Sequence, residues 1–173
     1  MDINNKKVLI VYFSRQGENY SNGKIVDLKV GNTEVAANMI SKLTNSDIFQ
    51  IKSIEEYPKD YNQCTKIAQV ELNENKRPVL VSDIHTNEYE VIYLGYPNWW
   101  GTMPMPVWTF LDNHNLDGKV IYPFCTHEGS GIGNSERDLR KLCPNSKIKK
   151  GLAIHGSSVK TSESIIKNWI MKG

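Results

Sequence analysis

The chain has 173 residues, which is typical of one domain and long enough to bury a core without disulfides or metal ions. Its 21 Lys and Arg against 19 Asp and Glu give a formal charge of +2, which argues against a nucleic-acid binder with a dense basic face. Hydrophobic residues make up 39% and charged residues 23%, a balance that excludes a disordered protein. We expect a single domain over residues 1–173.

The apolar runs and the cysteines indicate a protein of the reducing cytoplasm. The first apolar run, residues 8–13, is too short for the core of a signal peptide or for a membrane span. The three cysteines, Cys64, Cys125 and Cys143, are widely spaced and form no C-x-x-C pair, so they support neither a disulfide framework nor a zinc ribbon. We expect a cytoplasmic protein that has no membrane or nucleic-acid partner.

The first half of the chain predicts two strand–helix units. Residues 8–13 are continuously apolar, as in a strand that is buried on both faces. Residues 34–45 carry apolar side chains at helical spacing, and residues 47–52 predict a second strand. Residues 61–76 then predict a helix with a weak apolar face. Between the first strand and the first helix, residues 25–30 predict a short strand or a flap.

The second half repeats this alternation. Residues 91–96 predict a third buried strand, and a helix follows near Pro104 or Pro106, because proline is tolerated in a first helical turn. Residues 119–125 predict a fourth strand, and Ser135 is a suitable N-cap for the helix after it.

A short strand over residues 151–155 and a helix over about 162–171 complete five strand–helix units. This alternation predicts an α/β fold, a doubly wound five-stranded parallel sheet with helices on both faces.

Ligands of open parallel sheets bind beyond the carboxyl ends of the strands, where the strand order reverses. Three loops at these ends are rich in glycine, hydroxyl or aromatic residues; they comprise residues 14–19 with 31–33, residues 97–102 and residues 126–133. The first offers hydroxyl groups and backbone N–H groups at a helix N-terminus, which suit a phosphate or simply cap the helix. The glycines of the third loop let its backbone approach a ligand closely.

The second loop contains two adjacent tryptophans, Trp99 and Trp100. A flat aromatic ligand stacks well on an indole ring, but one of the two could equally belong to the core and the other to a partner surface. Taken together, the three loops suit a ligand that has a phosphate at one end and a planar ring at the other.

These motifs together resemble the flavodoxin-like family. The family's phosphate loop follows its first strand as S/T-x-T-G-x-T; here Tyr12-Phe13-Ser14-Arg15 resembles its start and Gly31-Asn32-Thr33-Glu34 its end. Residues 91–101 resemble the second flavin loop, and residues 125–133 resemble the third. The resemblance extends from residue 7 to residue 170. It implies a strand order of 2-1-3-4-5, FMN as cofactor and a redox function.

The phosphate loop departs from the family pattern. Sixteen residues separate Ser14 from residues 31–33, where the family has two, so about 14 are inserted, at about residues 16–30. A split interpretation joins Ser14 to residues 31–33, whereas an unsplit alternative continues directly from Ser14, with Gln16 and Asn19 in place of the threonines. We prefer the split interpretation because the helical pattern begins just after residues 31–33.

The resemblance implies a set of cofactor-binding residues and no catalytic side chain, because a flavin carries the electron chemistry itself. In the first loop these residues are Ser14, Arg15, Gln16, Asn32 and Thr33. At the dimethylbenzene or central edge of the ring they are Pro97, Asn98, Trp99, Trp100 and Gly101. At the pyrimidine edge they are Thr126, His127, Glu128, Gly129 and Gly131.

Other uses of such a fold lack the residues that they need. A phosphoacceptor receiver requires acidic residues after the first strand, where Ser14, Arg15 and Gln16 stand, and the G-x-G-x-x-G of a dinucleotide-binding domain is absent. A Ser14 nucleophile has no base that the sequence identifies. The four histidines show no metal-binding spacing, so we expect no metal site.

Two functional classes remain. One is an electron-transfer module that passes electrons between partner proteins; the other is an NAD(P)H-dependent FMN oxidoreductase that reduces quinones or similar small acceptors. A charge of +2 lacks the acidic bias usual for shuttle flavodoxins. The insertion could also cover the flavin edge, as an enzyme requires.

Overall fold

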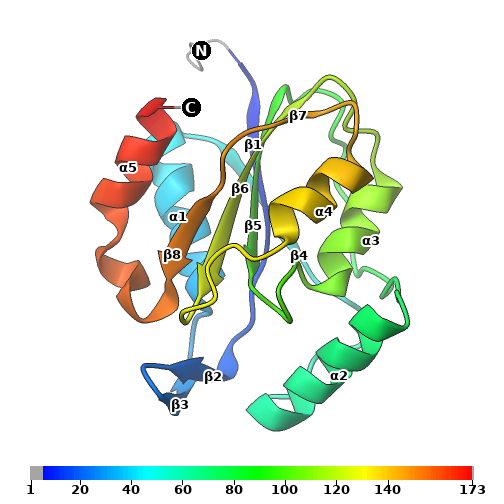
Figure 1. The fold of residues 1–173 in the computed structure, drawn as a ribbon. Coiled ribbons are helices and arrows are strands. Elements are labelled where there is room, and N and C mark those ends of the chain that lie inside the picture. Colours follow the sequence, from blue (N-terminus) through cyan, green and yellow to red (C-terminus); the bar gives the residue numbers. More distant parts are fainter. Residues whose placement is uncertain (1–5, 173) are drawn as a thin grey trace.

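The computed structural model describes residues 6–172 and has an α/β architecture (Figure 1). Its main sheet is parallel, with the order β4-β1-β5-β6 and with β7 and β8 both paired to β6. The strands are β1 Val8–Phe13, β4 Asp47–Ile51, β5 Val91–Pro97, β6 Val120–His127, β7 Lys147–Ile148 and β8 Leu152–His155. Counting β7 and β8 as two pieces of one fifth strand, this confirms the predicted order 2-1-3-4-5.

Helices cover both faces of the sheet (Figure 1). On one face lie α1 (Asn32–Thr44) and α5 (Glu163–Lys172), and on the other lie α3 (Met105–Asn113) and α4 (Ser135–Leu142). The short 3-10 helix η1, Gly156–Thr161, follows β8. Helix α2, Tyr61–Asn73, lies instead below the carboxyl ends of the strands in this view, where it borders the functional site.

The alternation of side chains in β1 explains why its sequence is apolar throughout. Leu9, Val11 and Phe13 pack into the core cluster shared with α3 and α4. Ile10 and Tyr12 pack into the cluster shared with α1 and α5. Because both faces are covered, every position of the strand is buried, and each large apolar side chain contributes about 1.5–3 kcal/mol to stability.

A two-stranded antiparallel hairpin stands apart from the main sheet. It consists of β2, Gly17–Ser21, and β3, Lys24–Leu28, and it lies below the sheet, across from α2 (Figure 1). Asn22 and Gly23 form its turn with φ values of 48° and 80°, as a two-residue hairpin loop requires. The short strand expected within residues 25–30 is thus the second arm of a hairpin.

One sequence expectation about a helix start is wrong. Asn134, and not Ser135, is the N-cap of α4. The Ser135 hydroxyl instead donates a hydrogen bond to the Ile132 carbonyl, at 2.6 Å, and accepts one from the Tyr96 hydroxyl, at 2.9 Å. A buried tyrosine hydroxyl needs a partner, and this need takes precedence over capping.

The sequence predicted neither disulfides nor long apolar segments, and the structure of residues 6–172 agrees with both predictions. Cys64, Cys125 and Cys143 are all buried and free. No helix within residues 6–172 has the length and apolar character that crossing a membrane requires.

Candidate functional site

A cavity of about 490 Å³ lies beyond the carboxyl ends of β1, β5 and β6. Its volume falls within the range of sites that hold small molecules and cofactors. The three loops singled out in the sequence meet around it. The expected residues that line it are Ser14, Arg15, Asn32, Thr33, Pro97, Asn98, Trp99, Trp100, Thr126, His127 and Glu128. The expected residues outside its lining are Gln16, Gly101, Gly129 and Gly131.

The two halves of the split first loop lie against each other. An added Cβ at Gly31 would stand only 2.2 Å from the Ser14 hydroxyl, and that hydroxyl accepts a hydrogen bond from the Glu34 amide at 3.0 Å. Within residues 6–172, the amides of Asn32 and Thr33 in the same helical turn have no hydrogen-bond acceptor. Unpaired amides at a helix N-terminus are suited to binding an anion.

A pair of threonine hydroxyls joins the first loop to the third. Thr33 Oγ1 and Thr126 Oγ1 lie 2.8 Å apart, and both residues are buried. The Thr33 side chain is therefore engaged with the protein, so its backbone N–H is the group that remains for a ligand.

The Arg15 side chain belongs to the scaffold of the site. Its guanidinium donates hydrogen bonds to the carbonyls of Glu18, Pro58, Lys59 and Asp60. The Pro58 and Lys59 bonds each measure 2.6 Å. Arg15 thus lines the cavity as expected, but its charged group is committed to joining the base of the hairpin to the start of α2.

The unsplit alternative receives mixed support. Gln16 is exposed and does not line the cavity. Asn19 does line it, but its amide nitrogen donates hydrogen bonds to the carbonyls of Arg15, at 3.3 Å, and Gly17, at 3.0 Å.

The two tryptophans have different surroundings. Trp99 packs edge-to-face on Phe13 and Tyr57, with ring centroids 5.2 Å and 5.0 Å away, so it forms part of a fixed aromatic cluster. Trp100 is 51% exposed, and its indole N–H donates a hydrogen bond to the Thr65 carbonyl at 2.9 Å. One tryptophan is therefore a wall of the core, and the other is an accessible ring at the cavity.

Asn98 and two glycines connect the second loop to the third. The Asn98 amide nitrogen donates to the Gly131 carbonyl at 2.8 Å, and the Gly101 amide donates to Asn98 Oδ1 at 2.9 Å. Both ends of the Asn98 side chain are thus used within the protein. Gly101 and Gly131 shape the loops without lining the cavity.

His127 is a neutral residue at the cavity. Burial lowers its pKa, and the neighbouring His155 lowers it further. Its Nδ1 accepts a hydrogen bond from the Gly129 amide at 2.9 Å, which requires that this nitrogen carry no proton. His127 therefore offers a hydrogen-bonding ring and not a positive charge.

Both carboxylate oxygens of Glu128 accept hydrogen bonds from backbone amides of the protein. One carboxylate oxygen accepts a hydrogen bond from the Ser157 amide at 2.6 Å, and the other accepts one from the Asn22 amide at 3.1 Å. His155 Nδ1 lies 2.7 Å from the Ser157 hydroxyl and 3.6 Å from the Glu128 carboxylate. Because one nitrogen serves both contacts, this Ser-His-Glu cluster cannot relay a proton as a catalytic triad does.

Sequence reasoning missed one whole wall of the cavity. Tyr61, Cys64, Thr65 and Ala68 line it from α2, at a spacing that places them on one helix face. This stripe is too polar to stand out as a buried face, so only the position of α2 reveals it. The other lining residues outside the expected set are Tyr20 and Ser130, together with Asn19, which only the unsplit alternative had named.

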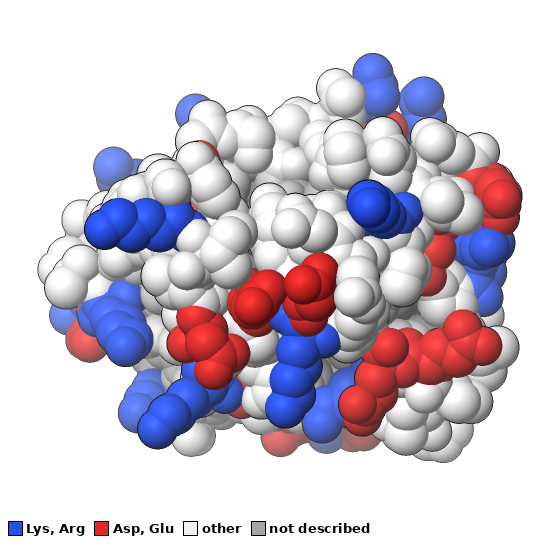
Figure 2. Space-filling view, turned by 90° about the horizontal axis from the view of Figure 1, so that it is seen from below, with Lys and Arg blue, Asp and Glu red and all other residues white. Residues whose placement is uncertain are grey.

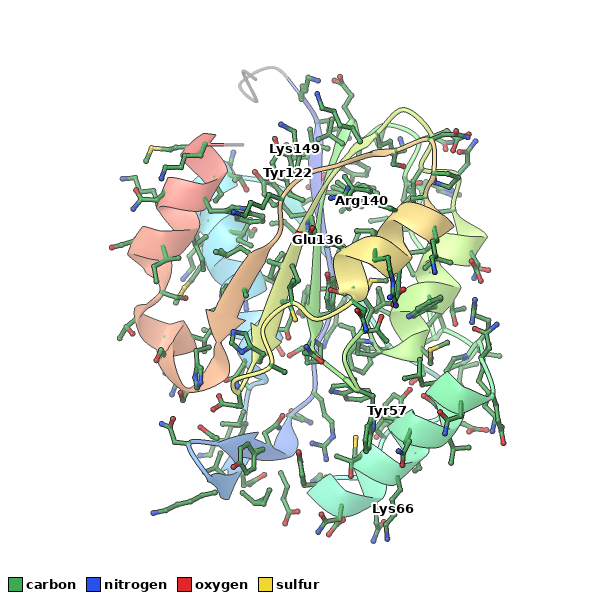
Figure 3. The ribbon with its side chains drawn as sticks, viewed as in Figure 1. Tyr57, Lys66, Tyr122, Glu136, Arg140 and Lys149 are labelled. Atoms are coloured by element: carbon green, nitrogen blue, oxygen red, sulfur yellow. The ribbon has the colours of Figure 1, made fainter. Side chains whose placement is uncertain are left out.

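The α2 wall is chemically quiet. Burial raises the pKa of the Cys64 thiol to about 11, so it stays protonated near neutral pH. Tyr57 donates a hydrogen bond to Glu71 at 2.6 Å, and burial raises the pKa of both groups. Figure 3 shows Tyr57 between α2 and the end of the sheet, whereas Lys66 points away into solvent. The labelled Tyr122, Glu136, Arg140 and Lys149 lie toward the opposite end of the molecule (Figure 3).

The described residues contain no candidate metal-binding site. Within residues 6–172, no three His, Cys, Asp or Glu side chains are grouped so that they could hold a metal ion.

Comparisons with known proteins identify the family. Residues 7–172 match the model of a family described as Flavodoxin. A provisionally assigned flavoprotein of Bacteroides eggerthii is 31% identical, with 97% of this chain and 98% of that chain covered and a TM-score of 0.78. A second one, from Bacteroides uniformis, is 27% identical, with 96% and 98% covered and a TM-score of 0.75.

A third solved structure shares the fold at lower identity. It is a flavoprotein from Lactobacillus acidophilus in complex with FMN, 24% identical, with 90% of this chain and 97% of that chain covered and a TM-score of 0.66. No curated protein sequence matches the chain. The family match spans nearly the whole sequence, and the parallel sheet has the expected order. The chain belongs to the flavodoxin family.

Proposed function

We propose that this protein binds FMN in the cavity and acts as a redox protein in electron transfer. One observation carries the proposal. The backbone amides of Asn32 and Thr33, which have no acceptor, and the accessible ring of Trp100 border the same cavity. An anion site and an aromatic surface suit the phosphate and the planar ring of FMN. The Lactobacillus flavoprotein with the same fold, solved with FMN, supports the same ligand.

The residues present divide the binding between them. The first turn of α1 would hold the phosphate, with Ser14 fixing that turn through the Glu34 amide. Pro97 and Trp100 would border the ring, while Trp99 and Asn98 hold this loop in place. When bound, FMN supplies the one-electron and two-electron redox chemistry, and the protein contributes orientation and electrostatics.

A titration tests the cofactor. Purified protein is mixed with FMN or with riboflavin, which lacks the phosphate, and the change in flavin fluorescence is followed. We expect FMN to bind and riboflavin to bind about tenfold or more weakly, because the charged hydrogen bonds to the helix amides are lost. Absence of FMN binding would overturn the proposal, and equal binding of the two flavins would remove the phosphate site from it.

A second candidate is an NAD(P)H-dependent FMN oxidoreductase that reduces quinones or similar acceptors. It is favoured by the two walls of the cavity that lie outside the sheet, the hairpin and α2, whose rings Tyr20 and Tyr61 lie 6.4 Å apart between centroids. Figure 2 shows the face below the sheet, where Lys and Arg lie beside Asp and Glu over the lower half and the upper half is mostly white with scattered Lys and Arg. Such a face lacks the acidic field that steers a shuttle to basic partners.

An activity measurement distinguishes the two functions. NADH and NADPH oxidation are followed with the FMN-loaded protein and a soluble quinone. Turnover of about 1–10³ s⁻¹ would identify a reductase, since this is the usual range of enzymes. Negligible turnover with both nicotinamides would support the electron-transfer module.

A further inference from the structure

The hairpin cannot hold its position by its own packing. Of residues 17–28, only Gly17 is buried. A two-stranded hairpin with so little buried surface is marginally stable by itself and opens at low cost. Its position beside the cavity must therefore be set by contacts with the rest of the protein.

The base of the hairpin is fixed firmly to the start of α2. The Glu18 amide donates a hydrogen bond to the Lys59 carbonyl at 3.0 Å, and the Glu18 carboxylate accepts one from the Tyr61 amide at 2.9 Å. The Arg15 guanidinium joins the same two segments. The base of the hairpin is therefore held in a fixed position relative to α2.

The tip has a single polar anchor. The Asn22 amide in the turn donates to Glu128 Oε2 at 3.1 Å. Within residues 6–172, no other hydrogen bond or ion pair joins residues 20–28 to the rest of the fold. Glu128 itself is held in place, because its second oxygen accepts the Ser157 amide at 2.6 Å.

This anchor is a single hydrogen bond at the surface, but its acceptor is a charged group. The Glu128 side chain is only 13% exposed, so its charge is largely withdrawn from water. A carboxylate in such surroundings depends on its N–H donors, and hydrogen bonds to charged groups are stronger than neutral ones. Releasing the tip would leave one oxygen without its donor until water replaces it.

The anchor closes one side of the cavity. Tyr20, on the outer part of the hairpin, and Glu128, which holds the tip, both line that cavity. We propose that Glu128 is a positioning residue that latches the hairpin across the cavity and so sets how fast FMN enters and leaves. This inference rests on the proposed cofactor. Glu128 acts here through the hairpin, and not as a contact at the pyrimidine edge of the ring.

A latch has a kinetic signature that a ligand contact lacks. If FMN passes only when the hairpin is open, weakening the latch raises the open fraction both before and after binding. The association and dissociation rate constants then rise together, and the dissociation constant changes little. Loss of a direct contact to FMN would instead raise the dissociation rate constant and the dissociation constant alike.

Two substitutions at Glu128 test this in the full-length protein. Glu128→Gln keeps one accepting oxygen, whereas Glu128→Ala removes both. Stopped-flow fluorescence measures FMN binding and release. We expect both rate constants to rise about tenfold in Glu128→Ala and less in Glu128→Gln, while the dissociation constant stays within about threefold.

Two control variants separate the latch from general effects. Glu163→Gln removes an exposed carboxylate on α5, away from the cavity. Asp27→Asn removes an exposed charge on the hairpin itself and leaves the hydrogen bond from the Asn22 amide to Glu128 in place. Both should leave the two rate constants within about twofold of the unmodified protein.

Hydrogen exchange of the flavin-free protein gives a readout that needs no cofactor. The amides of residues 20–28 should exchange about tenfold faster in Glu128→Ala, while those of β1 stay unchanged. Unchanged hairpin exchange would overturn the latch, as would a rise of the dissociation rate constant alone. If the unmodified protein binds no FMN but the exchange effect is present, the hairpin anchor stands and the proposed cofactor fails.

Discussion

Trp99 and Thr102 exchange two backbone hydrogen bonds, with the Trp99 amide 3.0 Å from the Thr102 carbonyl and the Thr102 amide 3.2 Å from the Trp99 carbonyl. Trp100 and Gly101 are therefore the two central residues of a tight turn, and their φ values are 54° and 83°. A turn with two positive φ values favours Asn-Gly. A bulky residue in the left-handed region is strained by roughly 1–2 kcal/mol. Trp100 occupies a position that asparagine would fill with less strain.

This strain predicts a separation of stability from binding. Trp100→Asn and Trp100→Ala both remove the indole and its hydrogen bond to Thr65, but asparagine tolerates positive φ better than alanine. In urea unfolding, we expect Trp100→Asn to be more stable than Trp100→Ala by about 1 kcal/mol. Both should bind FMN about tenfold more weakly, since the exposed ring surface is lost. Equal stability would show that the turn is unstrained, and unchanged FMN binding would place the cofactor away from Trp100.

The Arg15 clamp predicts a cost in stability. In Arg15→Lys, one ammonium group replaces a planar fork that donates to several carbonyls, among them those of Pro58 and Lys59. We expect the free energy of unfolding in urea to fall by about 1–3 kcal/mol. Arg137→Lys is a matched control, because Arg137 pairs with Asp138 at a largely exposed position and should change stability by less than about 0.5 kcal/mol. If Arg15→Lys bound FMN more weakly while its free energy of unfolding stayed unchanged, the result would show that Arg15 contacts the ligand directly.

The strands could be predicted because buried parallel strands have an unmistakable apolar pattern, whereas their order was implied by the resemblance to the flavodoxin-like family. Residues 8–13 were expected as a strand, and β1 has those bounds. Two-residue β7 carries no such pattern, since its pairing depends on β6 beside it. The hairpin could be predicted only in part. Its second arm is apolar enough to suggest a strand, whereas its first, Gly17–Ser21, is polar and gains its partner through the Asn22-Gly23 turn.

The candidate site could be predicted where it follows the strand ends, and not where it depends on the position of α2. Ser14, Trp100 and Thr126 stand at or just beyond the ends of their strands, where the parallel topology brings them together. Cys64 and Thr65 reach the cavity because α2 lies below the sheet, and nothing in their local pattern reports that placement. The hydrogen-bond partners of the site's side chains, such as the carbonyls that Arg15 contacts, could not be predicted from the sequence either.

The environment of His127 predicts a pH dependence of stability. Burial and His155 lower the pKa of His127 in the folded protein, while Glu128 opposes this shift, so the unfolded chain takes up the proton more readily. The stability that this residue contributes is therefore complete above pH about 6.5 and declines as the pH falls through the lower folded pKa. In urea unfolding between pH 8 and pH 5, His127→Asn should lose less stability than the unmodified protein. Its amide oxygen can still accept the Gly129 N–H, so the comparison isolates titration, and parallel pH profiles would contradict it.

The close approach of Gly31 to the β1 loop predicts that even one methyl group disrupts the phosphate end of the cavity. Gly31 has a φ of −67°, which alanine adopts freely, so Gly31→Ala acts through space alone. The new Cβ would stand 2.2 Å from the Ser14 hydroxyl and 2.6 Å from the Arg15 carbonyl, and that backbone atom cannot turn aside. We expect a loss of about 1–3 kcal/mol in urea unfolding, with the preference for FMN over riboflavin reduced because the first turn of α1 shifts. Gly156→Ala is the comparison, since the atoms nearest to its Cβ would belong to the side chains of Asn32 and Glu128. Side-chain atoms give way more easily than a backbone carbonyl, so its loss of stability should be smaller, and equal losses in the two variants would show that the Gly31 contact is not what fixes the loop.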